Sequence, residues 1–218
     1  MLKQREAPVL YYGNVPESQH HAHQLVGHAL DNLNHYVDCF ESALELHDHG
    51  QAKHLATKGK RWRIFRHWQF IAARDGALSI YHFHWTLQGL VSAVSDCKYL
   101  SDRLDLTAIR TARKQFESWF PNAIQLRHAV GHSAERTKNR RDHIEHGFTG
   151  ICKIPGLNRG RVRDYVITDH LYRRTFCNTW KGKIECYKIN GQNMERLALT
   201  RNAIFDVFDE MNRKFRGS

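Results

Sequence analysis

The chain has 218 residues, of which 41% are hydrophobic and 25% are charged, and its formal net charge at pH 7 is +11. These values are typical of a soluble globular protein with a substantial core. No run of about 18 apolar residues is present, so we expect no transmembrane helix and no membrane partner. The first six residues, Met1–Glu6, lack an apolar signal core, so secretion by a cleaved signal is not expected.

The five cysteines form no CxxC pair, and their odd number leaves one thiol over. This usage is typical of reduced thiols, so we predict a cytoplasmic protein. Cys177 and Cys186 flank Lys181-Gly182 and could face each other across a hairpin. A disulfide between them is nevertheless not expected in a reducing compartment.

The positive charge is concentrated between residues 136 and 188. This stretch holds 13 Lys and Arg against 5 Asp and Glu, so it contributes 13 − 5 = +8 of the net charge. A localised basic surface favours a polyanionic partner, because each phosphate contact releases condensed counterions. A solvated basic face that only keeps the protein soluble is the alternative.

Apolar residues at helical spacing predict a helix over residues 17–46, which Asp48-His49-Gly50 would end. A second helix is predicted over residues 62–100. Its apolar residues cover most of the circumference, which is typical of a helix at the centre of a bundle. A third helix starts at Asp105 and ends at Pro121. We expect it to turn inward Ile109, Ala112, Phe116 and either Trp119 or Phe120.

A fourth helix is predicted over residues 122–137. With Val130 at zero on a helical wheel of roughly 100° per residue, His128 and His132 fall at about 160° and 200°. Arg127 and Gly131 lie on the flank. The histidines are therefore expected to point away from the helix's own core, toward water, a ligand or a second subunit. The apolar stripe within about 40° of Val130 consists of Ala123, Leu126 and Ala134.

Between residues 147 and 190, β-branched and aromatic residues cluster between Gly and Pro breaks, and two runs around Lys181-Gly182 predict a β-hairpin. A last helix is predicted over residues 192–214, with an apolar side that includes Leu197, Leu199 and Ile204. We therefore expect a single, mainly α domain over residues 1–218. It would be a bundle of about five helices (17–146 and 191–214) with a small antiparallel β insertion (147–190) before the last helix.

This order of elements, with Arg127-His128-x-x-x-His132 on the fourth helix, resembles the HEPN superfamily of helical-bundle proteins. The family pattern is an Arg, a polar residue and then a His after four to six intervening positions. Arg127 matches the Arg, His128 the polar residue and His132 the His. The resemblance implies a HEPN-like bundle in which the motif helices of two subunits face each other, and so a homodimer with a composite cleft. It also implies metal-independent endoribonuclease activity, or RNA, nucleotide or protein binding without catalysis.

RNA carries its own nucleophile, the 2′-hydroxyl, so cleavage needs a base, an acid and cationic donors to the phosphorane. A histidine titrates near neutrality and serves as base or acid, and an arginine offers a fixed fork of donors. His132 would be the base or acid, Arg127 the phosphate clamp and His128 an orienting or second proton-transfer group. The product would be a 2′,3′-cyclic phosphate, and no metal or other cofactor is expected.

A second Arg-x4-His pair, Arg141 with His146, also has a polar residue, Asp142, after the arginine. We prefer the first pair, because its apolar periodicity supports a packed helix. A basic run follows the motif and is expected to guide an RNA backbone past the histidines. It consists of Arg136, Lys138, Arg140 and Arg141.

The chain contains 16 histidines, which raises the alternative of a histidine-rich metal-binding bundle. His20 and His23 share a face of the first predicted helix, and His28 is within reach of it. No Cys or carboxylate completes a zinc set by spacing, so we expect these histidines to be solvated or in the core.

Overall fold

A computed structural model of the chain describes residues 5–58, 61–131 and 137–216. Contacts divide the chain into two compact units. The first unit comprises residues 1–38, 82–121 and 194–218, and the second comprises residues 39–81 and 122–193. In the described residues, no helix is both long enough and apolar enough to cross a membrane.

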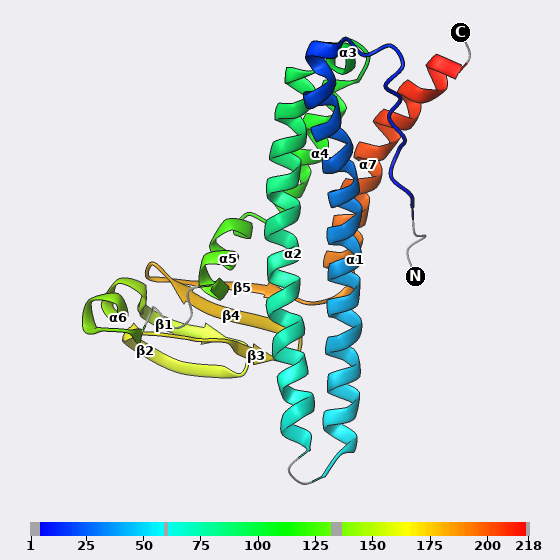
Figure 1. Ribbon diagram of the computed structural model, residues 1–218. Coiled ribbons are helices and arrows are strands. Elements are labelled where there is room, and N and C mark those ends of the chain that lie inside the picture. Colours follow the sequence, from blue (N-terminus) through cyan, green and yellow to red (C-terminus); the bar gives the residue numbers. More distant parts are fainter. Residues whose placement is uncertain (1–4, 59–60, 132–136, 217–218) are drawn as a thin grey trace. The chain divides into compact units, whose positions relative to one another are not determined.

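The structure is mainly helical and carries two small antiparallel sheets (Figure 1). The helices are the 3-10 turn η1 (Glu17–Gln19), α1 (His20–Ala56), α2 (Trp62–Asp96), α3 (Lys98–Ser101), α4 (Leu106–Trp119), α5 (Ala123–Gly131), α6 (Arg140–His146) and α7 (Gly191–Arg216). The strands are β1 (Phe148–Ile154), β2 (Leu157–Tyr165), β3 (His170–Tyr172), β4 (Thr175–Trp180) and β5 (Lys183–Lys188). The mainly α class with a small β insertion is thus confirmed.

Helix α1 extends ten residues beyond the predicted end at Leu46, so the expectation that Asp48-His49-Gly50 ends it is wrong. Gly50 is buried, and a Cβ atom there would lie 2.9 Å from the carbonyl oxygen of Phe65 in α2. The glycine therefore permits close approach of two helices in the second unit instead of ending a helix. His47 is fully buried, and its Nε2 lies 3.0 Å from the carbonyl oxygen of Arg173.

Helix α4 of the first unit forms as predicted. The carboxylate of Asp105 caps the helix by accepting hydrogen bonds from the backbone N–H groups of Thr107 and Ala108. One face of the helix is buried, as expected, through Ile109, Ala112 and Phe116. The Phe116 ring stacks with the Phe83 ring of α2 at a centroid distance of 5.2 Å.

Helix α7 differs from its prediction in the first unit. Leu199, expected on its apolar side, is 47% exposed, whereas Arg201 is 2% exposed. The Arg201 guanidinium donates a hydrogen bond of 2.8 Å to the side-chain oxygen of Asn34 in α1. The helix therefore presents a face that contains one partnered guanidinium among apolar side chains, including Leu197 and Ile204.

In the second unit, the three-stranded sheet (order β3-β4-β5) is joined to the N-terminal half of α2 by buried polar contacts. The hydroxyl of Tyr187 donates a hydrogen bond to the carbonyl oxygen of Ala73. Gly76 makes room for this contact, because a Cβ atom there would lie 2.8 Å from the Tyr187 hydroxyl. A separate small core contains Cys152 and Ile154 of β1 together with Ile167 and Cys177.

The β4–β5 hairpin forms around Lys181-Gly182 as predicted, but its thiols are not both free. Cys177 and Cys186 face each other in the register of the hairpin and form a disulfide. The expectation of reduced thiols is wrong for this pair, because the hairpin register places the two residues opposite each other on adjacent strands. Cys39, Cys97 and Cys152 are not disulfide-bonded.

Reduction of this disulfide should destabilise the second unit. The bond closes a loop with a sequence separation of nine residues, for which loop-closure entropy predicts a loss of about 2–3 kcal/mol of unfolding free energy. Urea unfolding of the wild-type chain with and without reductant, and of Cys177→Ser/Cys186→Ser, measures this loss. Alkylation of the unfolded, unreduced chain should modify three cysteines, and modification of all five would contradict the disulfide.

Acidification should destabilise the first unit between pH 7 and pH 5. Burial lowers the pKa of His23 and of His84, so in this range the unfolded chain binds more protons than the folded chain. The neutral imidazoles contribute their full stabilisation above the pKa of an unfolded-state histidine, about 6.5. This contribution is lost as the pH falls toward the lowered pKa of the folded state. His23→Gln should reduce the fall in Tm from pH 7 to pH 5, whereas His28→Gln, an exposed neighbour on α1, should not. If Tm fell by the same amount from pH 7 to pH 5 in both variants, burial of His23 would not be the cause of the destabilisation.

Candidate functional site

The predicted motif helix begins close to its expected start and places its apolar stripe inward. Ala123, Leu126 and Val130 are buried, as the wheel predicts, and Ala129 is buried beside them. This face packs against β4 and β5 of the same unit. Three residues of the motif region, His132, Ala134 and Arg136, lie outside the described residues.

Arg127 is half-buried, and its guanidinium has partners on two sides. It lies over the ring of Tyr81 in α2, 5.7 Å from the ring centroid. Its Nη1 lies 3.5 Å from Nδ1 of His128. A Cβ atom at Gly131 would lie 4.0 Å from the guanidinium carbon, so the Arg127 side chain runs along α5 toward its C-terminal end. This direction brings the cation to the end of the helix that precedes His132 in the sequence.

His128 is half-buried, and the wheel did not foresee its contact. Its imidazole stacks on the ring of Trp180, the last residue of β4, with a centroid distance of 5.3 Å and an interplanar angle of 9°. The expectation that His128 turns only toward water, a ligand or a second subunit is therefore wrong. The wheel fails here because a helix that packs on a hairpin can be contacted by the hairpin on its flank as well as on its apolar face.

The second Arg-x4-His pair lies on α6, where only the histidine is buried. Asn139 caps this helix by accepting a hydrogen bond from the backbone N–H of Asp142, and Arg141 is exposed. The His146 imidazole stacks on Trp180 with a centroid distance of 4.4 Å and an interplanar angle of 14°. Its Nδ1 accepts a hydrogen bond of 3.3 Å from the backbone N–H of Lys181, so the neutral ring carries its proton on Nε2.

The two Arg-x4-His segments, which the sequence predicts as alternative sites, therefore contact the same residue. His128 from α5 and His146 from α6 both stack on Trp180, and we call these three residues the Trp180 cluster. Trp180 is half-buried between the hairpin and the two helices. Its position directly before the Lys181-Gly182 turn was the available sequence signal, but no periodicity pairs it with residues 34 and 52 positions earlier.

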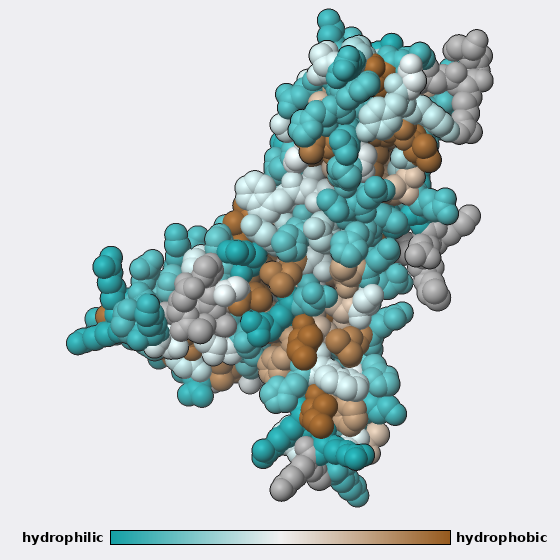
Figure 2. All heavy atoms as spheres, viewed as in Figure 1, coloured by the Kyte–Doolittle hydropathy of each residue, from teal (hydrophilic) through white to brown (hydrophobic). Residues whose placement is uncertain are grey.

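Exposed Lys and Arg side chains lie on the segments of the chain that adjoin the Trp180 cluster. The predicted basic residues Lys138, Arg140 and Arg141 are all exposed, and so are Lys181 and Lys183 at the hairpin turn. Figure 2 shows that the visible face formed by α6 and the β1–β2 hairpin is largely hydrophilic. A half-buried guanidinium beside imidazoles, with solvated cations on the adjoining segments, can bind a phosphodiester and move a proton near it.

The outer face of the β1–β2 hairpin adds cations that sequence reasoning did not single out. Arg159, Arg161 and Arg163 occupy alternate positions of β2 and are exposed, as is Lys153 on β1. Alternation along a strand was the available signal, because it places side chains on one face. A polyanion bound to the second unit could extend over this face.

Among the residues that the structure describes, no three His, Cys, Asp or Glu side chains are grouped as a metal ion requires. Comparisons with family models, with curated proteins and with solved structures found no match to this chain.

Replacing His146 should cost more stability than replacing a histidine on the exposed side of the same helix. His146→Ala removes a ring stack and leaves the backbone N–H of Lys181 without its partner, a loss of about 1–3 kcal/mol. His143→Ala, at an exposed position of α6, should change the unfolding free energy by less than about 0.5 kcal/mol. Urea unfolding measures both, and equal effects would show that the stack does not hold α6.

Proposed function

We propose that this protein is a metal-independent endoribonuclease of HEPN-like type whose site is built on α5. The observation that carries the proposal is the contact of the Arg127 guanidinium with the His128 imidazole at the C-terminal end of this helix. Exposed cations on α6 and on the hairpin turn support RNA as the partner, because phosphates are bound largely by Lys and Arg.

In the proposed reaction, the 2′-hydroxyl of one nucleotide attacks its own 3′-phosphate. The new 2′-O–P bond forms as the bond from phosphorus to the 5′-oxygen breaks, which yields a 2′,3′-cyclic phosphate and a free 5′-hydroxyl. Arg127 donates hydrogen bonds to the non-bridging oxygens and stabilises their developing charge. His132, which the family pattern assigns as base or acid, would take the proton of the 2′-hydroxyl or protonate the leaving oxygen.

His128 is proposed to act as an orienting group. Its stack on Trp180 restricts the ring, and Nδ1 faces the Arg127 guanidinium, so Nε2 carries the proton of the neutral ring. An imidazole fixed in this way can hold Arg127 in a conformation that meets a phosphate. The family pattern also implies a homodimer in which two copies of α5 face each other, so that each cleft receives residues from both.

A non-catalytic module that binds RNA, nucleotides or a protein partner is the second candidate. It is favoured by the packing of the imidazoles: His146 is 9% exposed with Nδ1 engaged, and His128 is half-buried against Trp180. Histidines held by stacking in this way are suited to positioning cations without transferring protons. In that case the same face would retain RNA intact.

Incubation of labelled single-stranded RNA with the full chain in EDTA tests the proposal. The wild type should cleave it to products that end in a 2′,3′-cyclic phosphate. Arg127→Ala and His132→Ala should each lower the rate at least 100-fold, the range expected for loss of a transition-state donor or a proton-transfer group. His143→Ala, an exposed histidine of α6, should retain the wild-type rate.

Circular dichroism of each variant establishes that folding is intact. RNA binding without cleavage by the wild type would reject the enzyme and support the binding module. Cleavage that stops in EDTA would reject the metal-independent mechanism. A strict monomer by light scattering under the assay conditions would contradict the composite cleft.

A further inference from the structure

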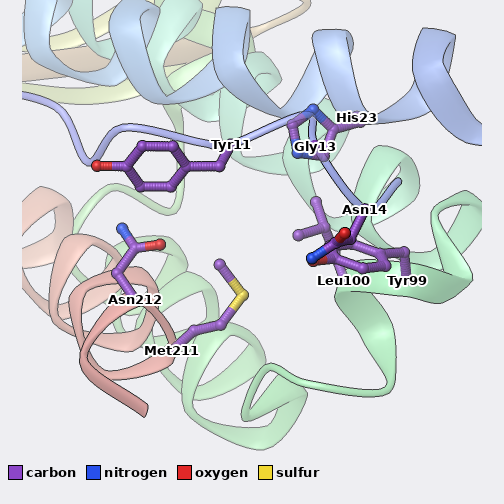
Figure 3. Close-up of a pocket in the computed structure, with 8 residues that line it drawn as sticks. All are labelled: Tyr11, Gly13, Asn14, His23, Tyr99, Leu100, Met211 and Asn212. Atoms are coloured by element: carbon purple, nitrogen blue, oxygen red, sulfur yellow. The ribbon is translucent and has the colours of Figure 1, made fainter. Parts of the chain in front are cut away.

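The first unit contains a cavity of about 550 Å³ that has no part in the site on α5. It is enclosed by the segment before α1, the first turns of α1, the short helix α3 and the last turns of α7 (Figure 3). This volume is in the range of small-molecule pockets. Figure 3 shows side chains around an open centre, with Tyr11 and Asn212 on one side and Asn14 and Tyr99 on the other.

The cavity has an apolar floor and aromatic walls. Leu100 and Met211 are buried beneath it, and Tyr11 and Tyr99 contribute rings from the N-terminal segment and from α3. The Met211 thioether points toward the open centre in Figure 3. Rings and a thioether together suit a flat, unsaturated ligand, which can stack on the rings and contact the sulfur.

His23 gives the cavity a buried polar atom without a partner. The side chain is 1% exposed, and its Nδ1 makes no hydrogen bond in the described residues. Burial lowers the pKa of His23, so the imidazole is neutral at pH 7. The imidazole therefore adds a neutral, buried ring to the wall of the cavity.

Two asparagines add neutral hydrogen-bonding groups. The side-chain amide of Asn212 donates a hydrogen bond of 3.0 Å to the carbonyl oxygen of Val9, which leaves its oxygen as an acceptor. Asn14 is exposed at the mouth and offers both an amide donor and an acceptor. None of the described residues that line the cavity carries a formal charge when His23 is neutral, so the part of the ligand inside the cavity is uncharged.

A cationic groove continues from the mouth of the cavity and shares Asn14 and Tyr99 with it. Lys98 and Arg103 line this groove, together with one acid, Asp102. The Arg103 guanidinium lies over the Tyr99 ring, 4.1 Å from its centroid. A ligand with a neutral ring and an anionic tail would place its tail here.

We propose that this cavity binds an adenine mononucleotide, with the base in the cavity and the phosphate toward Lys98. Asparagine side chains pair with the edge of adenine, and aromatic side chains stack on its face. The neutral lining excludes the phosphate from the cavity, and the groove accepts it. This site is distinct from the endoribonuclease proposed for α5 and does not depend on it.

Calorimetric titration of the full chain in EDTA with AMP, adenosine and ribose 5-phosphate tests the proposal. AMP should bind saturably with one site per chain, adenosine three- to tenfold more weakly, and ribose 5-phosphate not measurably at millimolar concentration. Two outcomes overturn the proposal: no saturable binding of AMP, and binding of ribose 5-phosphate as tightly as AMP, which would indicate an anion site only.

Variants locate the binding. Asn14→Leu and His23→Gln should each weaken AMP at least tenfold, whereas Asn32→Leu, an exposed asparagine on α1, should not. Lys98→Ala should remove the advantage of AMP over adenosine. Because Asn14 is exposed, its variant is expected to fold even if His23→Gln does not. Unchanged AMP affinity in Asn14→Leu overturns the assignment, and Arg127→Ala should leave AMP binding intact whatever its effect on RNA.

Discussion

Trp180 at the end of β4 is the contact on which the candidate site depends, because imidazoles from two separate helices stack on its ring. Helices of nine and seven residues are too short to be stable in water without tertiary packing. The helices α5 and α6 therefore take their positions from the β4–β5 hairpin. The Cys177–Cys186 disulfide cross-links the two strands of that hairpin. Loss of the ring would remove the stacking contacts of His128 and His146 together.

Both units contain buried polar groups with partners and, among the described residues, buried polar atoms without a hydrogen bond. In the first unit, Arg201 is buried but bonded to Asn34, whereas Nδ1 of His23 has no partner in the described residues. In the second unit, Tyr187 and His47 are buried and bonded to backbone carbonyls. Buried groups that have partners fix the packing of each unit.

Local signals in the sequence predicted local structure well. The Asp105 cap, the inward face of α4 and the Lys181-Gly182 hairpin all depend on neighbours within a few positions, and all are observed. The sequence predicts a helix end at Gly50 because both a helix end and a close contact between helices favour glycine. Only the position of Phe65 distinguishes the two.

The site was predicted only in part for a related reason. Arg127 and His128 were found by motif, and the buried face of α5 by periodicity. The convergence of His128 and His146 on Trp180 depends on how two helices fold back onto one hairpin, and no spacing along the chain encodes it. The spacing of Cys177 and Cys186 allows a disulfide across the hairpin, but the expectation of a reducing compartment argues against it. The disulfide forms because the hairpin register places the two cysteines opposite each other.

We propose that RNA binds against the α5 helix beside the Trp180 cluster. Amide and indole NMR spectra of the isotope-labelled full chain, titrated in EDTA with RNA whose 2′-hydroxyls are methylated to prevent cleavage, test it most directly. RNA bound at this place should cause saturable shifts in α5, α6, the β4–β5 turn and the indole N–H of Trp180. Shifts confined to other segments, or none at millimolar RNA, would contradict it.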